Sequence, residues 1–289
     1  MEKLLIDGTA EDYRFNWQSS VKPFPVAAPV LEPEPAPRGP SLVVRAAWTI
    51  PVLERISPWV LRNRLAWDEL NRVEADKRAG VVERYDHAVE DWKRSKVSFD
   101  QQQFARAEDR RRLYESKDRD ALLEYWARVL EKPILGGKPT PVRSLDYQET
   151  LGKLIVSCAL PPVAEIPKIA EVRFSQPLNA IVEDPLSAER VTELHRDLII
   201  KIALVAMYRL FQSDTANALS SIAFNGNIDT IDRATGREVS PCVIAVRADK
   251  ADVMSMNFAL VDTAACLHRL GGKVSGDLAD LRPVDPITE

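Results

Sequence analysis

The spacing of apolar residues along the chain predicts a helical region followed by a region of mixed strands and helices. From Ser57 to about Lys132, apolar residues recur at helical intervals among many charged ones. Pro58 suits the first turn of a helix, where no N–H donor is needed. After Lys132, short apolar runs bounded by proline and glycine alternate with helical stretches, which is typical of an α+β domain. The expected elements are strands at 153–160 and 170–174, a helix at 187–212, and a hairpin and a short helix within 220–270.

The helical region contains a short seam of apolar side chains at alternating three- and four-residue steps, interrupted once by Lys96. The seam is too short for a long coiled coil. It predicts a long, charged helical hairpin arm, with a bend near Ser98 or around Ser116. The seam residues are Val82, Tyr85, Val89, Trp92 and Phe99, and the residues expected to bury them are Leu113, Leu122, Leu123, Trp126 and Val129.

The α+β domain is expected to form around one buried helix. Within 187–212, the apolar stripe of the first turns widens until nearly every later position is apolar, which indicates that the C-terminal half is covered on most sides. The hairpin that follows contains Gly236, which suits a tight turn because glycine adopts left-handed backbone conformations without steric cost.

The N-terminal part of the chain is predicted to be a tail and a proline-rich linker. Seven prolines between 22 and 40 favour extended polyproline conformation over a packed element. The aromatic residues Tyr13, Phe15 and Trp17 could form a docking peptide for a partner, or they could belong to a loosely ordered terminus. The expected organisation is a tail and linker at 1–56, a helical arm at 57–132, and an α+β domain at 133–289.

Composition adds few constraints. The chain has 289 residues with a formal net charge of -4, which argues against nucleic-acid binding through bulk positive charge alone. No run of about 18 apolar residues is present, so we expect a cytoplasmic protein that does not enter a membrane. Cys158, Cys242 and Cys266 are widely spaced in apolar surroundings, so we expect reduced core thiols and not zinc ligands.

Basic residues in two places are candidates for contact with DNA phosphates. Arg110, Arg111 and Arg112 lie in a stretch, 105–120, where eleven of sixteen residues are charged, and the flanking acidic residues partly cancel their field. A solvated helix face explains this cluster as simply as a DNA contact does. Arg247 and Lys250, near the end of the second hairpin strand, are the other candidates, as phosphate contacts and not base readers.

Two carboxylates suggest a comparison with metal-dependent nucleases. Asp229 or Asp232 could supply one ligand, with Lys250 as the lysine of such a site. A second ligand is missing, because Ala248 stands two residues before Lys250 and offers no side-chain oxygen. An exposed Asp229 and a turn built by Asp232 and Gly236 explain the same pattern. We therefore expect no catalytic residue, no bound metal and no cofactor.

The last third of the chain resembles the region that precedes the nuclease domain in Mrr-like restriction endonucleases. The resemblance is strongest over 214–287, and weaker similarity extends back to residue 58. The chain differs from the members of that family at three positions. They tend to have an aromatic residue where Asn227 stands, Gln at the position of Arg247 and Lys at the position of Asp277. The segments that carry the resemblance are Phe224-Asn225-Gly226, the hairpin through Gly236 to the Pro241–Ala248 strand, Val261–Leu267, and the closing Pro283–Ile287.

The resemblance implies a role in DNA restriction or phage defence, with cleavage carried by a metal-dependent domain beyond Glu289. The expected function is a noncatalytic accessory or regulatory module that positions or regulates a nuclease domain, in cis or in trans, and that could contact DNA. One alternative is a structural protein that forms homo-oligomers through helices in 57–132 and does not bind DNA. A degenerate metal-dependent nuclease fold is the other alternative.

Overall fold

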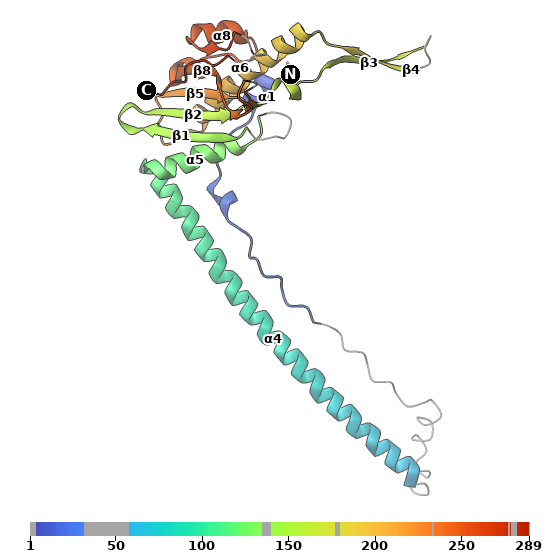
Figure 1. Ribbon diagram of the computed structural model, residues 1–289. Helices are drawn as coiled ribbons and strands as arrows, with labels where there is room; N and C mark the ends of the chain where they lie inside the picture. Colours follow the sequence, from blue (N-terminus) through green and yellow to red (C-terminus); the bar gives the residue numbers. More distant parts are fainter. Residues whose placement is uncertain are drawn as a thin grey trace. The chain divides into compact units, whose positions relative to one another are not determined.

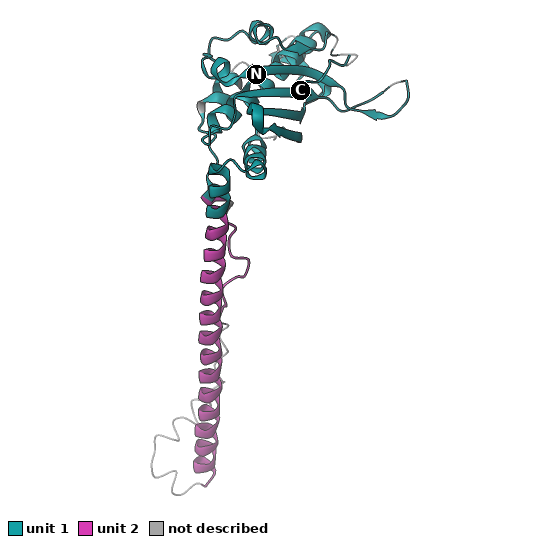
Figure 2. Ribbon diagram, turned by 90° about the vertical axis from the view of Figure 1, so that its left-hand side faces the viewer, with its two compact units in different colours: residues 1–17, 108–289 teal, residues 18–107 magenta. Residues whose placement is uncertain are grey.

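The computed structural model describes residues 4–31, 58–134, 140–176, 180–232, 234–276, 278 and 282–288. These residues form two compact units (Figure 2): unit 1 is Met1–Trp17 with Glu108–Glu289, and unit 2 is Gln18–Ala107. The division differs from the predicted one, because the start of the chain and the end of the helical region both belong to unit 1. The second half of the expected proline-rich stretch, from residue 32, lies outside the described residues, as does Ser57.

The secondary structure mixes helices with three small sheets (Figure 1). The helices are α1 (Leu4–Ala10), η1 (Trp17–Ser20), α4 (Pro58–Glu115), α5 (Arg119–Glu131), η2 (Glu149–Leu151), η3 (Val163–Glu165), α6 (Ala188–Ser213), α7 (Lys250–Met254) and α8 (Thr263–Arg269). The strands are β1 (Val142–Gln148), β2 (Lys153–Ala159), β3 (Ile169–Ser175), β4 (Ala180–Pro185), β5 (Ser221–Asn227), β6 (Thr230–Ile231), β7 (Glu238–Val239), β8 (Cys242–Asp249) and β9 (Lys273–Val274). The predicted α+β class is confirmed.

The helical region is one long helix and one short helix. α4 runs without a break through Ser98, and the chain turns at 116–118, where Lys117 has a φ of 62° and Asp118 caps α5 by accepting from the Ala121 N–H at 3.0 Å. The predicted bend around Ser116 is therefore correct and the one near Ser98 is wrong. The packing expected of a hairpin is also wrong, because the apolar side chains of α5 are buried against β1 and α6.

In unit 2, an extended segment of the chain runs beside α4 (Figure 2), and its contacts cover part of the apolar seam. We call this segment, residues 21–31, the strap. The Trp92 indole N–H donates to the Val26 carbonyl at 2.8 Å, and the Phe24 ring lies 6.0 Å from Trp92 and 5.5 Å from Phe99. The seam thus finds its apolar partner in the N-terminal part of the chain and not in the residues after Ser116.

The main sheet of unit 1 has five strands in the order β1-β2-β5-β8-β9. β2 and β5 are parallel and the other neighbours are antiparallel. The connection between the two parallel strands contains α6, as a parallel pair requires a crossover. The predicted hairpin corresponds to β5 and β8, with the small β6–β7 ribbon at its tip and a φ of 67° at Gly236. β1, β4 and β9 were not predicted.

The two faces of this sheet differ in polarity because side chains alternate along each strand. One face is apolar, and α5 packs on it over β1 while α6 packs over β5 and β8. The opposite face carries most of the polar side chains, and we call it the polar sheet face. The apolar face includes Tyr147, Leu154, Val156, Cys158, Ile222, Phe224, Ile244 and Val246, and the polar sheet face includes Asp146, Lys153, Ser157, Asn225, Asn227, Arg247 and Lys273.

α6 is the central buried helix, as predicted. Ser187 caps its start by accepting from the Arg190 N–H at 3.2 Å, and nearly every residue from Leu198 to Phe211 is buried. Arg209 is also buried there, 3% exposed, and it holds the N-terminal segment of unit 1. Its guanidinium donates to the Tyr13 hydroxyl at 2.9 Å, and it lies 3.9 Å from the centre of the Tyr13 ring. Tyr13, assigned to the tail from sequence, is therefore a core residue.

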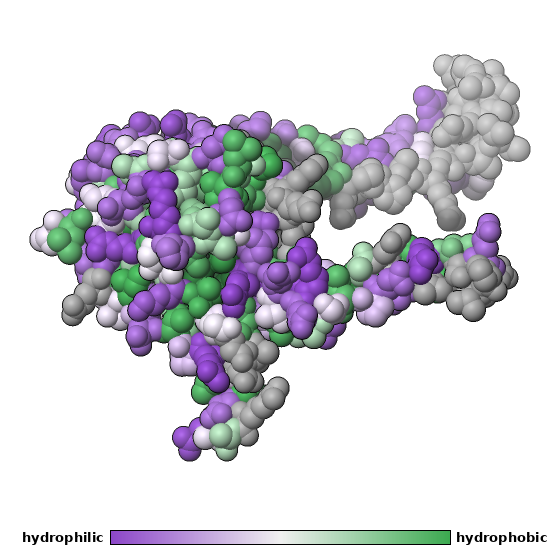
Figure 3. All heavy atoms as spheres, turned by 90° about the horizontal axis from the view of Figure 1, so that it is seen from above, coloured by the Kyte–Doolittle hydropathy of each residue, from purple (hydrophilic) through white to green (hydrophobic). Residues whose placement is uncertain are grey.

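Strands β3 and β4 form a separate two-stranded ribbon that projects from the body of unit 1 (Figures 1 and 3). Val172 and Phe174 point to one side of it with Ile181, and their exposed fractions are 59%, 60% and 72%. Two-stranded ribbons have little stability of their own in water, so the ribbon depends on its junction with the body.

Other predictions concern the cysteines and membranes. Cys158, Cys242 and Cys266 are buried free thiols, as expected, and burial raises the pKa of Cys158 to about 12. No helix in the described part of the chain is long and apolar enough to cross a membrane.

Burial of His195 in α6 is expected to make stability depend on pH. His195 is fully buried, and burial lowers its pKa although its Nε2 contacts the Pro161 carbonyl at 2.9 Å. The unfolded chain therefore binds a proton at a higher pH than the folded one. Stability is fully present above about pH 6.5, and it should fall by up to ~1.4 kcal/mol per pH unit as the pH drops below that value.

The measurement is urea unfolding at several pH values between 7.5 and 5.5. His195→Asn should remove this component of the pH dependence, whereas the matched change His268→Asn, at an exposed residue of α8, should leave it in place. An unchanged pH dependence in His195→Asn would contradict the assignment.

Candidate functional site

The register of β5 and β8 separates the residues proposed for a degenerate nuclease site. Ser221 pairs with Asp249 at one end of the two strands, and Asn227 pairs with Cys242 at the other. Lys250 therefore lies at the first end, and Asp229 lies beyond the second, about 20 Å away at ~3.3 Å per residue. These two side chains cannot share a metal ion.

Asp229 and Asp232 have structural partners of their own. Asp229 is exposed and forms an ion pair with Arg143 of β1. Asp232 accepts from the Thr235 hydroxyl at 2.6 Å and the Ala234 N–H at 2.9 Å, and these bonds hold the pKa of its carboxyl below the usual value. Among the described residues, no three His, Cys, Asp or Glu side chains gather closely enough to hold a metal.

The three consecutive arginines at the end of α4 are exposed, and each has an acidic neighbour. Arg110 contacts Glu124 of α5 at 2.7 Å, and Arg111 contacts Glu115 at 2.8 Å. Arg112 lies 3.9 Å from Glu108. Surface pairs of this kind are weak and screened by salt, so phosphates could compete for the guanidinium groups. The contacts of these arginines are those of a solvated helix face, the simpler of the two interpretations of the cluster.

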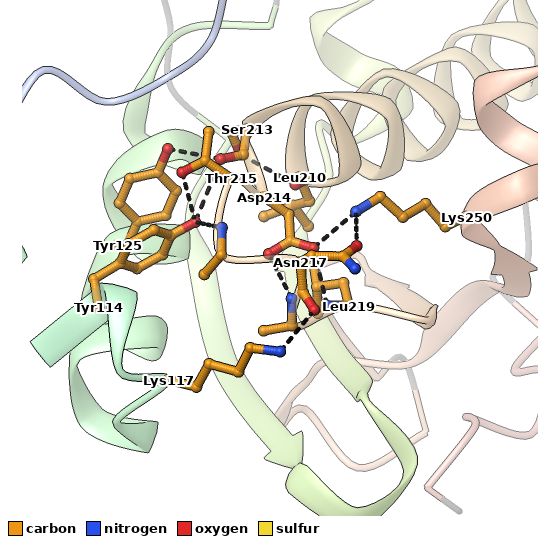
Figure 4. A network of polar contacts seen from close by, with 12 residues as sticks. Tyr114, Lys117, Tyr125, Leu210, Ser213, Asp214, Thr215, Asn217, Leu219 and Lys250 are labelled. Atoms are coloured by element: carbon orange, nitrogen blue, oxygen red, sulfur yellow. Dashed lines mark hydrogen bonds and ion pairs between the residues drawn. The ribbon is translucent and has the colours of Figure 1, made fainter.

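Lys250 begins α7 and is held by a buried carboxylate (Figure 4). The Asp214 side chain has no exposed surface, and its oxygens accept from the N–H groups of Ala218 at 3.0 Å and Leu219 at 2.9 Å. Lys250 Nζ donates to Asp214 at 2.9 Å and to the side-chain oxygen of Asn217 at 3.0 Å. Lys250 is therefore engaged in the fold and poorly placed for a phosphate.

Tyrosines from three elements hold the same loop between α6 and β5, and two of them, Tyr114 and Tyr125, are shown in Figure 4. Burial raises the pKa of Tyr125 to about 12, so its hydroxyl stays protonated and donates to the Ser213 carbonyl at 2.8 Å. The Tyr114 hydroxyl accepts from the Ala216 N–H at 3.3 Å, and Tyr147 donates to the carbonyl of Ala218 at 2.9 Å. The network thus joins α4, α5, β1 and α7 to one loop of unit 1.

The polar sheet face contains a contact that sequence reasoning missed. The Asn225 side chain donates to the Ile287 carbonyl at 2.9 Å and accepts from the Ile287 N–H at 2.9 Å, as a neighbouring strand would. Val284 N–H donates to the Cys242 carbonyl at 2.8 Å. These bonds fix the segment 282–288 on the sheet, and we call them the Asn225 clasp.

The residue after Asn225 must be small. A Cβ atom at Gly226 would lie 2.3 Å from a methyl carbon of Leu160 and 2.6 Å from one of Ile244. Each residue of the Phe-Asn-Gly sequence therefore has its own role. Phe224 supplies a buried ring, Asn225 binds the C-terminal segment, and Gly226 leaves room for the side chains of Leu160 and Ile244. Asn225 and Pro283–Ile287 were both singled out from the sequence, but nothing in their spacing indicated that they touch.

Asn225→Ala is expected to release the segment 282–288. Loss of two hydrogen bonds should lower the free energy of unfolding by about 1–2 kcal/mol and speed hydrogen exchange at the Ile287 amide. Exchange measured by mass spectrometry on a peptide that covers this segment checks the effect. The control, Ser157→Ala, removes a hydroxyl on the same face that bonds to Asn227 at 3.1 Å, and it should leave exchange at Ile287 unchanged.

Of the five basic residues predicted to contact DNA, Arg247 is the one that is exposed and has no ionic partner among the described residues. It lies on the polar sheet face. Lys273 of β9 pairs with Ala245, so it stands diagonally next to Arg247 on the same face. Two cations are therefore side by side at this edge, and Asp249 is the nearest exposed acidic residue along β8.

Comparisons with known proteins do not place the chain in a family. No protein-family model matches it, and neither does any curated protein or solved structure.

Proposed function

We propose that this chain is a noncatalytic accessory module of an Mrr-like DNA restriction system. It positions or regulates a nuclease domain, supplied in cis or in trans, and it contacts DNA phosphates in the cytoplasm. The resemblance over 214–287 motivates the restriction context, and the observation that carries the proposal is the Asn225 clasp.

The clasp suits a positioning module for a geometric reason. A misplacement of about 1 Å in the reactive groups of an enzyme can lower its rate by about a hundredfold, so a domain that supports a nuclease has to present it from a fixed point. The paired bonds to Ile287, with the Val284 bond, give the segment that leaves the sheet a defined path. A nuclease domain attached in cis after this segment, or docked against it in trans, would therefore be held at a defined position on the sheet.

The geometry favours the accessory role over the nuclease alternative. Asp229 and Lys250 stand at opposite ends of the β5–β8 pair, and Asp232 serves a turn. A purely structural protein would have no affinity for DNA. A measurement of DNA binding therefore distinguishes that alternative from the proposal.

DNA contact should begin at Arg247. Its guanidinium is exposed with Lys273 beside it, whereas Arg110, Arg111 and Arg112 must first exchange their acidic neighbours. Each phosphate neutralised adds about 0.9 to the slope of log affinity against log salt. Arg247→Ala should therefore lower that slope by about 0.9.

The experiment is a titration of fluorescent duplex DNA with the whole chain at several salt concentrations, with Mg²⁺ present and the DNA length checked afterwards. The proposal requires salt-dependent binding, intact DNA and a reduced slope in Arg247→Ala. The control Arg190→Ala, at an exposed residue of α6, should keep the full slope. Metal-dependent cleavage would instead establish a nuclease, and no binding at low salt would favour the structural alternative.

A further inference from the structure

The apolar seam of α4 has the pattern of a helix-pairing surface. Val82, Tyr85, Val89, Trp92 and Phe99 follow alternating steps of three and four residues, the spacing at which two helices interlock. Tyr85, Val89, Trp92 and Phe99 are half-buried, whereas Val82 at the start of the seam is 45% exposed. The described strap contacts account for only the later part of the seam.

Among the described residues, the strap meets that later part of the seam through one aromatic ring and a hydrogen bond. Phe24 places its ring against Trp92 and Phe99 in edge-on geometry, and one hydrogen bond joins the Trp92 indole to the Val26 carbonyl. Pro23 and Pro25 on either side of Phe24 lack an N–H and favour an extended strap. Phe24 therefore supplies the apolar contacts in place of a partner helix.

Lys96 should weaken the pairing of this seam with a second helix. It stands at a seam position and reaches Asp100 on its own helix at 3.2 Å. A lysine at one such core position is typical of two-stranded pairs, where it specifies register at a cost in stability. A pair of α4 helices would thus be reversible, and a short competing segment could prevent it.

We propose that the seam of α4 is a pairing surface for a second copy of this chain, and that the strap competes for it through Phe24. With the strap in place, Trp92 and Phe99 are covered and the chain is monomeric. When the strap leaves, the seam from Val82 to Phe99 is open to the same seam of another copy.

The test is analytical ultracentrifugation of the full chain over a range of concentrations, with circular dichroism to follow helix content. Phe24→Ala should tighten self-association by about tenfold or more, which corresponds to ~1.4 kcal/mol. Its matched control, Val30→Ala, changes a strap residue that is 82% exposed and should behave as the wild type. Adding Val89→Asp to Phe24→Ala should restore the monomer, because a carboxylate in the seam disfavours pairing.

Three outcomes would overturn the proposal. Phe24→Ala and Val30→Ala could show the same mass at every concentration. Val89→Asp could leave the association of Phe24→Ala intact, which would place the contact elsewhere. A Phe24→Ala variant that stays monomeric and loses helix content would show that the strap only stabilises α4.

Discussion

Replacing Asp214 by alanine is expected to lower the free energy of unfolding by about 3 kcal/mol, at the low end of the range for breaking a buried ion pair because Lys250 is partly exposed. The Asp214 carboxylate has no exposed surface, and it accepts from two backbone N–H groups and from Lys250. Its removal would leave the N–H groups of Ala218 and Leu219 without acceptors in a buried loop. Equilibrium unfolding in urea, followed by tryptophan fluorescence, measures the loss.

The control for this change is Asp249→Ala. Asp249 directly precedes Lys250 and is exposed, and its side chain makes no capping hydrogen bond to α7. An exposed carboxylate of this kind should change stability by no more than about 0.5 kcal/mol. Equal losses in the two variants would mean that the Asp214 network does not organise the loop between α6 and β5.

Arg209→Met is expected to cost about 3 kcal/mol and to free the N-terminal segment of unit 1. Methionine keeps much of the buried volume but removes the bonds from the guanidinium to the Tyr13 hydroxyl and to the carbonyls of Lys132 and Pro133. Hydrogen bonds to a charged group contribute about 1.5–3 kcal/mol each, and the cation above the Tyr13 ring adds to this. Methionine avoids the free-energy cost of burying a cation, which offsets part of that sum.

Two measurements check this second effect. Urea unfolding gives the change in stability, and limited proteolysis reports whether residues 4–17 become accessible. Arg190→Met is the matched control, since Arg190 lies on the same helix but is exposed beside Glu193. Cleavage within 4–17 at the wild-type rate in Arg209→Met would contradict the anchoring role.

The sequence predicted those parts of the fold that are set by local patterns. The boundaries of α6 follow from its Ser187 cap and its widening apolar stripe, and the turn at Gly236 follows from its backbone requirement. The apolar run at 153–160 identified β2. That apolar run could not show that β2 pairs in parallel with β5, because tertiary packing decides which strands are neighbours.

The errors came from long-range contacts. Tyr13 looked like part of a tail because its partner, Arg209, is almost two hundred residues away. The seam of α4 was paired with later residues because the proline-rich strap carries only one aromatic side chain, Phe24, that could reveal its contact. Local spacing indicates that a face needs an apolar partner, and it does not identify that partner.

The candidate site was predicted only in part. The exposed position of Arg247 was expected, whereas the engagement of Lys250 by Asp214 depends on a loop closure that spacing does not reveal. The separation of Asp229 from Lys250 follows from antiparallel pairing of β5 and β8. The Asn225 clasp is a side-chain mimic of a strand, and no periodic pattern signals such a contact.

The most direct test of the central claim is to sequence the coding region beyond Glu289 together with the adjoining genes. The account predicts a metal-dependent nuclease domain, with an Asp and a Glu/Gln-x-Lys strand, either in the same reading frame or in a neighbouring gene. A region that encodes no nuclease in either place would contradict the accessory role in restriction.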